Sequence, residues 1–193
     1  MKTALFFGSF NPIHNGHLSI AEYVLEHTDI EELWFVVSPH NPLKEASDLA
    51  PEEHRLEMVR LSTAKYHPRI QVCDVEMQMP RPSYTIDTVN FLKSKYPHRE
   101  YAILMGADSL DTIEKWKNFK DLLDNNRILV YPRPKSNLLI LKEKYNVEVV
   151  DAPLLDISST FIRDSVRAGK NVSFYMPQEA NLYLVKNKLY LYI

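Results

Sequence analysis

Short apolar runs alternate with amphipathic stretches along the whole chain of 193 residues. Most of these runs are continuously apolar, which is typical of strands that are buried on both faces of a parallel sheet. We therefore expect strands at residues 3–7, 33–38, 70–75, 101–105, 127–131 and 147–150.

The stretches between these runs carry apolar residues at helical spacing, and some begin with residues that initiate helices. Pro51, for example, is followed by Glu52 and Glu53, and proline and acidic residues favour the first turn of a helix. We expect helices at residues 16–26, 51–65, 84–96, 109–116, 138–145, 158–168 and 177–188.

This alternation of strands and helices predicts an α/β fold with a doubly wound, mostly parallel, Rossmann-like sheet and helices on both of its faces. The length fits a single domain over residues 1–193, with the C-terminal helical part, about residues 158–193, packed on it. Ligands bind such sheets outside the carboxyl ends of the strands, so the loops after Phe7, Ser38 and Met105 are the expected binding loops. The long polar connection from His40 to Pro51 is another candidate.

Composition and charge limit the compartments and partners that we expect for this chain. No window approaches the roughly 20 apolar residues that span a bilayer, and the short apolar N-terminus is predicted to be a strand rather than a signal peptide. The single cysteine, Cys73, excludes an intramolecular disulfide framework, so we expect a cytoplasmic protein without a membrane partner. A net charge of −2 without a basic stripe disfavours an RNA-binding module and other nucleic-acid partners.

The segment GSFNPIHNGH, residues 8–17, joins the first predicted strand to the first predicted helix. Gly8 allows a close turn and Pro12 stiffens the loop, while the three-residue spacing of His14 and His17 places both imidazoles on one side of the first helical turn. The free N–H groups of a helix start already favour an anion such as phosphate. Structural histidines and metal-binding histidines are the alternatives, although no HExxH pattern supports a zinc site.

A second segment, ISSTFIR at residues 157–163, has the same character. Ser158, Ser159 and Thr160 are good N-cap residues, and Arg163 adds a permanent charge with a planar fork of donors. The alternative is an ordinary capped helix with a surface arginine.

Both segments resemble the signatures of the nucleotidylyltransferase superfamily. The first is similar to (T/S)-F-(D/N)-P-x-H-x-G-H, with Asn11 where aspartate is commoner, and the second is similar to I-S-S-T-x-I-R. The resemblance implies that His14 and His17 contact the ATP phosphates and stabilise the pentacovalent transition state. It also implies that the second segment binds the β- and γ-phosphates.

The middle of the chain resembles bacterial nicotinate-nucleotide adenylyltransferases in particular. PRPSYTIDTV at 80–89 is similar to their P-S-Y-T-x-D-T segment, MGADSLDTIEKWKNF at 105–119 to their G-A-D…W segment, and YPRP at 131–134 to the turn that follows. The stretch SPHNPLK, ending at Lys44, is similar to a loop whose lysine reaches the phosphates. The resemblance implies transfer of AMP from ATP to nicotinate mononucleotide, giving deamido-NAD and pyrophosphate.

Three groups of site residues are expected. Charge stabilisation in catalysis is assigned to His14, His17, Lys44 and Arg163. ATP binding is assigned to Gly8, Ser9, Phe10, Gly106, Asp108, Arg133, Ser158, Ser159 and Thr160. Nicotinate mononucleotide binding is assigned to Asn11, Ser83, Tyr84, Thr85 and Trp116.

The second substrate suits the last group chemically. Trp116 offers a cation–π face to a pyridinium ring, and the helix start at residues 83–85 offers N–H groups to a carboxylate. The alternatives are that Trp116 covers the core, that Tyr84 and Thr85 only start a helix, and that Asp108 is an N-cap. Mg²⁺ is the expected cofactor, held mainly by substrate oxygens and water rather than by a protein metal site.

The predicted reaction needs no protein nucleophile. A phosphate monoester has a second pKa near ~6, so the acceptor attacks as a dianion, and positioning and electrostatics remain as the enzyme's task. Phosphopantetheine adenylyltransferase is the alternative within the superfamily, and a nucleotide-binding regulator is the non-enzymatic one. Tyr183, Tyr190 and Tyr192 either form a contact within a homo-oligomer or close the core.

Overall fold

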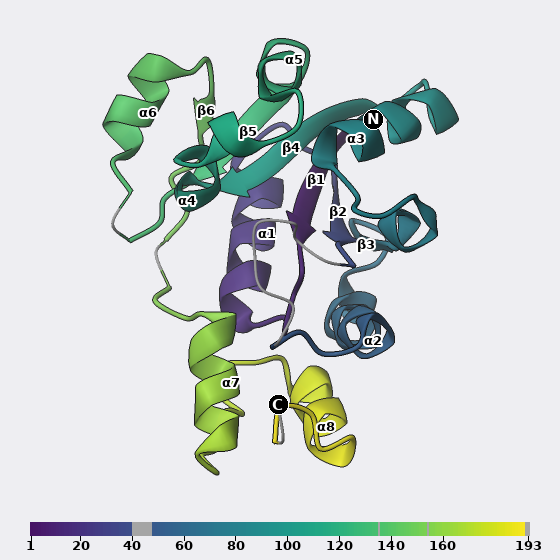
Figure 1. Ribbon diagram of the computed structural model, residues 1–193, viewed down its shortest axis with the longest axis vertical. Coiled ribbons are helices and arrows are strands. Elements are labelled where there is room, and N and C mark those ends of the chain that lie inside the picture. Colours follow the sequence, from purple (N-terminus) through teal and green to yellow (C-terminus); the bar gives the residue numbers. More distant parts are fainter. Residues whose placement is uncertain (40–47, 135, 154, 192–193) are drawn as a thin grey trace.

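The computed structural model describes residues 1–39, 48–134, 136–153 and 155–191. Its sheet has six parallel strands in the order β3-β2-β1-β4-β5-β6 within the described residues (Figure 1). The bounds are β1 Lys2–Gly8, β2 Glu32–Val37, β3 Ile70–Cys73, β4 Glu100–Gly106, β5 Arg127–Tyr131 and β6 Glu148–Val149. The doubly wound α/β prediction is therefore confirmed, and each predicted strand is present with small shifts of its ends.

The helices are α1 Asn15–His27, α2 Glu52–Thr63, α3 Thr85–Lys95, α4 Ala107–Leu110, α5 Phe119–Asp124, α6 Leu138–Lys144, α7 Ser159–Arg167 and α8 Gln178–Lys186. Short 3-10 turns lie at Ala64–Tyr66, Val75–Gln78 and Ile113–Lys115. Among the residues that the structure describes, no helix has the length and apolarity that crossing a membrane requires.

One predicted helix, at residues 109–116, is wrong. The helix α4 ends at Leu110, a 3-10 turn follows at Ile113–Lys115, and the unpredicted helix α5 begins at Phe119. The Thr112 hydroxyl donates to the Ser109 carbonyl at 3.1 Å, and such local side-chain bonds compete with the helical ladder. Asn118, in the left-handed conformation with φ of 50°, then starts α5 as a separate helix.

Two apolar layers hold the helices against the sheet. Alternate residues of each central strand point to opposite faces, so Phe35 packs with α1, α2, α7 and α8, whereas Trp34 packs with α3 to α6. Burial of both faces explains the continuous apolar runs in the sequence. The strand order reverses between β1 and β4, which makes the carboxyl ends of these two strands the expected ligand site.

The C-terminal segment packs against the loop that follows β1. The Tyr190 hydroxyl donates to Oδ1 of Asn11 at 2.8 Å, and the Asn15 N–H donates to the Tyr175 carbonyl at 2.9 Å. Tyr190 is buried in the core and Tyr183 is half-buried, bonded to His54, whereas Tyr192 lies outside the described residues. These contacts favour closure of the core for Tyr190, and homo-oligomer formation stays a prediction.

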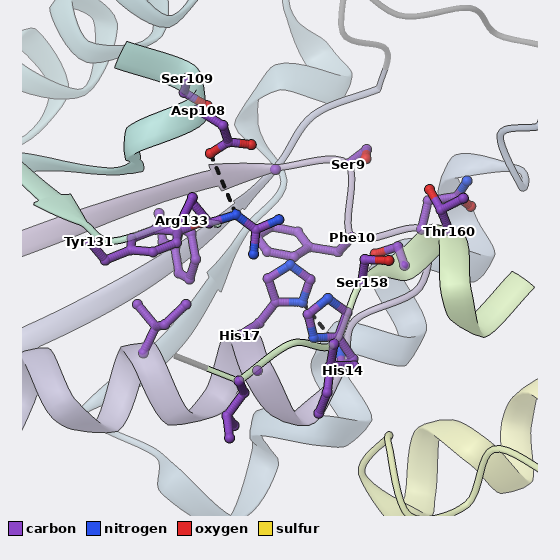
Figure 2. A pocket seen from close by; sticks show the side chains of 18 of the residues that line it. Ser9, Phe10, His14, His17, Asp108, Ser109, Tyr131, Arg133, Ser158 and Thr160 are labelled. Carbon is purple, nitrogen blue, oxygen red and sulfur yellow. Dashed lines mark hydrogen bonds and ion pairs between the residues drawn. The ribbon is translucent and has the colours of Figure 1, made fainter. Parts of the chain in front are cut away.

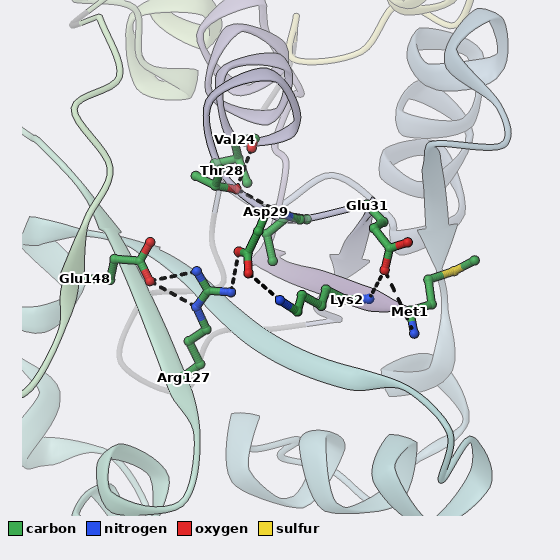
Figure 3. Close-up of polar contacts among 9 residues, drawn as sticks. Met1, Lys2, Val24, Thr28, Asp29, Glu31, Arg127 and Glu148 are labelled. Carbon is green, nitrogen blue, oxygen red and sulfur yellow. Dashed lines mark hydrogen bonds and ion pairs between the residues drawn. The ribbon is translucent and has the colours of Figure 1, made fainter.

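The opposite edge of the sheet, at the amino ends of the strands, is bridged by charged side chains (Figure 3). Asp29 accepts from Lys2 at 2.6 Å and from Arg127 at 2.6 Å, and Arg127 also pairs with Glu148 at 2.8 Å. Exposed pairs of this kind each contribute little stability, but this chain of pairs links β1, β5 and β6 at the end remote from the expected site.

Candidate functional site

A cavity of about 370 Å³ opens where β1, β4 and β5 end, beside the N-termini of α1 and α7. Figure 2 shows His14 and His17 at the start of α1 and Ser158 and Thr160 at the start of α7 directed to the same space. Its lining includes most of the residues predicted for ATP binding and for charge stabilisation, but not Gly106: Gly8, Ser9, Phe10, His14, His17, Asp108, Arg133, Ser158, Ser159, Thr160 and Arg163. Segments far apart in the sequence thus form one cleft.

The imidazoles of His14 and His17 stack face to face, with ring centroids 3.7 Å apart and planes 24° apart. Gly16 makes room for this arrangement, because a Cβ atom there would lie 3.0 Å from Nδ1 of His14. Burial, together with the nearby positive charge of Arg133, lowers the pKa of His14 to about 3. His14 is therefore neutral at physiological pH.

The protonation of His17 follows from a backbone contact. The His14 N–H donates to Nδ1 of His17 at 3.2 Å, so Nδ1 is an acceptor and the proton of the neutral ring is on Nε2. Edge contacts with the rings of Phe6 and Phe10 hold His17 in this orientation. The neutral ring therefore has its single N–H donor at Nε2.

The start of α7 is tied directly to the loop after β1. The Ser158 hydroxyl accepts from the Phe161 N–H at 3.1 Å, which confirms Ser158 as the N-cap. The Ser159 hydroxyl donates to the Pro12 carbonyl at 2.8 Å. Since that proton is used within the protein, the Ser158 and Thr160 hydroxyls and the first N–H groups of α7 are the donors that this segment can offer to a phosphate.

Arg163 also belongs to the contact between α7 and the loop after β1. Its Nη1 donates to the Asn11 carbonyl at 3.0 Å, and its Nη2 lies 3.6 Å from Oδ2 of Asp48. Asp48 also accepts from Arg167 at 2.8 Å. Sequence reasoning missed both Asp48 and Arg167, although the four-residue spacing of Arg163 and Arg167 places them on one face of a helix.

On the opposite side of the cleft, Asp108 follows β4 and Arg133 follows β5. Nε of Arg133 lies 3.6 Å from Oδ1 of Asp108 (Figure 2). A Cβ atom on Gly106 would lie 2.4 Å from the same oxygen, which explains glycine at the end of β4. The N-cap of α4 is Gly106, so the interpretation of Asp108 as an N-cap is wrong.

The residues assigned to nicotinate mononucleotide lie elsewhere, except for Asn11. Ser83, Tyr84, Thr85 and Trp116 do not belong to the described lining of the cavity. They lie on the α3 face of the sheet, where Trp116 is half-buried against the apolar layer. This position suits the core-covering alternative for Trp116, and their role in substrate binding stays a prediction.

The start of α3 is held by a buried carboxylate. Glu76, 2% exposed, accepts from the Ser83 hydroxyl at 2.9 Å and from the Thr88 hydroxyl at 2.8 Å. Lys117 lies 4.9 Å from the centre of the Tyr84 ring and pairs with Asp87 at 2.8 Å. Glu76 therefore fixes the orientation of the helix start that sequence reasoning assigned to the second substrate.

Asn11 is occupied by contacts within the protein. Its Oδ1 accepts from the Ala50 N–H at 3.1 Å and from the Tyr190 hydroxyl, and its Nδ2 donates to the Asp48 carbonyl at 2.7 Å. An aspartate could not donate this last bond. The remaining predicted residue, Lys44, lies outside the described residues.

The chain is similar to known proteins over most of its length. The family model of cytidylyltransferase-like proteins matches residues 5–165. A protein of Flavobacterium johnsoniae named "Probable nicotinate-nucleotide adenylyltransferase" is 44% identical over 192 residues, 98% of this chain and 99% of the relative. A Bacteroides fragilis protein of the same name is 45% identical over 175 residues, 91% of this chain and 87% of the relative.

The fold is also similar to that of a solved structure. The nicotinic acid mononucleotide adenylyltransferase of Plasmodium falciparum, complexed with NaAD, superposes with a TM-score of 0.84 and 20% sequence identity. The superposition covers 98% of this chain and 97% of the other. At this identity the likeness concerns the fold.

Proposed function

We propose that this chain, which belongs to the nicotinate-nucleotide adenylyltransferases of the cytidylyltransferase-like family, transfers AMP from ATP to nicotinate mononucleotide. A phosphate oxygen of the mononucleotide attacks the α-phosphorus of ATP, and the bond from that phosphorus to the β-phosphate oxygen breaks. Deamido-NAD and pyrophosphate are the products. The substrate is inferred from the names of the relatives, and the mechanism is inferred from the residues that line the cleft.

One observation supports phosphate transfer above all others: two helix starts converge on one cavity. The Ser159–Pro12 and Arg163–Asn11 hydrogen bonds, at 2.8 and 3.0 Å, hold the start of α7 against the loop that leads into α1. A triphosphate in this cavity would lie at the positive ends of both helix dipoles. Arg133 and Arg163 add positive charge from two sides.

The histidines then act as hydrogen-bond donors rather than as cations. His14 is buried and neutral, and two imidazolium rings stacked at 3.7 Å would repel each other. The Nε2–H group of His17 can donate to an α-phosphate oxygen whose negative charge increases in the transition state. Arg163 and Arg133 offset the charge of the leaving pyrophosphate and of the acceptor phosphate.

Mg²⁺ fits this cleft as an ion carried by the substrates. The acidic side chains that line the described cavity, Asp48 and Asp108, each lie near an arginine, and no group of three or more candidate metal ligands occurs among the described residues. The ion would be held mainly by the substrates and by water, and it would offset the charge of the leaving group. A cytoplasmic location suits an enzyme that uses ATP.

A coupled pyrophosphate-release assay tests the proposal. ATP is supplied with nicotinate mononucleotide, nicotinamide mononucleotide or phosphopantetheine, and we expect fast release with the first and much slower release with the others. Equal rates with the two pyridine nucleotides would contradict the proposed preference for nicotinate mononucleotide over nicotinamide mononucleotide. Release with phosphopantetheine alone would favour the other adenylyltransferase, and ATP binding without release from any acceptor would favour a regulator.

A further inference from the structure

Arg55, in the first turn of α2, is fully buried and bonds only to main-chain carbonyls among the described residues. Its Nε donates to Ala50 at 2.9 Å, and its Nη1 donates to Ser9 at 2.6 Å and to Ser38 at 2.7 Å. Its Nη2 donates to Pro39 at 2.7 Å. One guanidinium thus connects the loops that follow β1 and β2 with Ala50, two residues before α2.

This arrangement is a costly way to fill the interior. The ion pairs within the described part of the chain do not include Arg55, so four carbonyl dipoles compensate for its burial without a carboxylate. An apolar residue would fill the same volume without that desolvation penalty. Because bonded carbonyls lie in the loops after β1 and β2, Arg55 acts on the conformation of these loops.

The bond to Ser9 fixes the direction of the next amide. In a trans peptide unit the C=O and the following N–H point in opposite directions, so a Ser9 carbonyl directed to Arg55 turns the Phe10 N–H to the other side. Ser9 and Phe10 line the cleft, whereas Arg55 lies outside its lining. The Phe10 N–H makes no hydrogen bond to any described residue.

Phe10 itself is in a conformation that needs support. Its φ is 43°, in the left-handed region that a bulky side chain disfavours by roughly 1–3 kcal/mol. The carbonyl of the residue before it, Ser9, is held by Arg55, and the carbonyl of the residue after it, Asn11, is held by Arg163. Such strain persists only where neighbouring contacts define the backbone from both sides.

We propose that Arg55 is a positioning residue for phosphate binding: its guanidinium holds the Ser9–Phe10 peptide so that the Phe10 N–H is directed at the pyrophosphate part of ATP. The inference rests on the proposed function. It assigns Arg55 to the ATP side of the reaction and gives it no contact with the acceptor or with the reacting atoms.

The test compares Arg55→Lys with Arg60→Lys, a control on the same helix whose exposed side chain pairs with Asp74. Lysine keeps the charge but cannot reach all four carbonyls. We expect Arg55→Lys to weaken inorganic pyrophosphate binding, measured by calorimetry, and to raise KM for ATP, each by about tenfold to hundredfold, as for loss of a hydrogen bond to a charged group. KM for nicotinate mononucleotide should change little, and Arg60→Lys should match the wild type.

The outcomes separate the two proposals. Wild type that neither binds pyrophosphate nor turns over contradicts the proposed function. Active wild type with unchanged pyrophosphate binding in Arg55→Lys overturns the role of Arg55, as does an equal rise of both KM values alongside a lower Tm. If the variant does not fold, ¹⁵N-phenylalanine-labelled wild type decides: a shift of the Phe10 amide resonance on adding pyrophosphate supports the inference, and no shift overturns it.

Discussion

The Ser159 hydroxyl donates a hydrogen bond of 2.8 Å to the carbonyl of Pro12, a residue 147 positions earlier in the chain. Each of the two residues belongs to a segment that has the features of an anion-binding helix start. The bond fixes the distance between these starts, so that a single triphosphate can contact both. The cleft consequently depends on both ends of the chain being folded against each other.

Replacement of His17 with alanine should reduce kcat by about a hundredfold to a thousandfold, as removal of one preorganised donor does elsewhere. In the proposed mechanism the Nε2–H of His17 donates to charge that develops in the transition state, so KM for nicotinate mononucleotide should remain nearly unchanged. Steady-state kinetics with both substrates measures the two effects. His27→Ala, an exposed position on the same helix, is the matched control and should leave kcat intact.

The low pKa of His14 predicts how stability depends on pH. The folded protein holds His14 neutral down to about pH 3, whereas the unfolded chain binds a proton at its ordinary pKa of 6.5. Below pH 6.5 the unfolded state therefore binds more protons, and stability falls as the pH is lowered toward 3.

Urea unfolding at pH 7 and pH 5 checks this dependence. At pH 5 the difference of 1.5 pH units from 6.5 corresponds to about 2 kcal/mol. The free energy of unfolding of the wild type should fall by this amount more than that of His14→Gln between pH 7 and pH 5, because the variant lacks the titrating group. Identical pH dependence in the two proteins would show that His14 is not held neutral by burial.

Much of this architecture follows from patterns that the sequence displays. Buried parallel strands need apolar residues on both faces, and a helix start for phosphate needs small, hydroxylated or basic residues, so both leave recognisable segments. Arg55 leaves no such pattern, because EEHRLEM resembles a solvated helix and the carbonyls that Arg55 binds are a property of the folded loops. The same holds for Asp48, whose partners Arg163 and Arg167 are distant in sequence.

Replacement of Asp48 with asparagine should strengthen ATP binding. Asp48 places a negative charge beside Arg163 and Arg167 and lines the cleft in which the phosphates are expected to bind. Its side chain is 46% exposed, so the change should lower KM for ATP by no more than about fivefold. Asp164→Asn removes only the outward partner of Arg167 and should leave KM unchanged. Weaker ATP binding in Asp48→Asn would indicate that the carboxylate positions the arginines instead.

Replacement of Glu76 with glutamine should weaken the binding of nicotinate mononucleotide. The Glu76 carboxylate accepts hydrogen bonds from Ser83 and Thr88, and an amide group offers one acceptor oxygen in place of two. We expect the start of α3 to lose its fixed orientation, so that its N–H groups no longer align with the nicotinate carboxylate. KM for nicotinate mononucleotide should rise about tenfold, as for a weakened hydrogen bond to a charged group.

The measurement that isolates this effect is the ratio of the two Michaelis constants. KM for ATP should stay near the wild-type value in Glu76→Gln, because the ATP cleft is built from other elements, and Asn90→Ala, exposed on the same helix, should change neither constant. A variant in which both constants rise together would mean that Glu76 only stabilises the fold. If KM for the nicotinate substrate does not change, the start of α3 does not bind its carboxylate, and the acceptor site must lie on another part of the sheet edge.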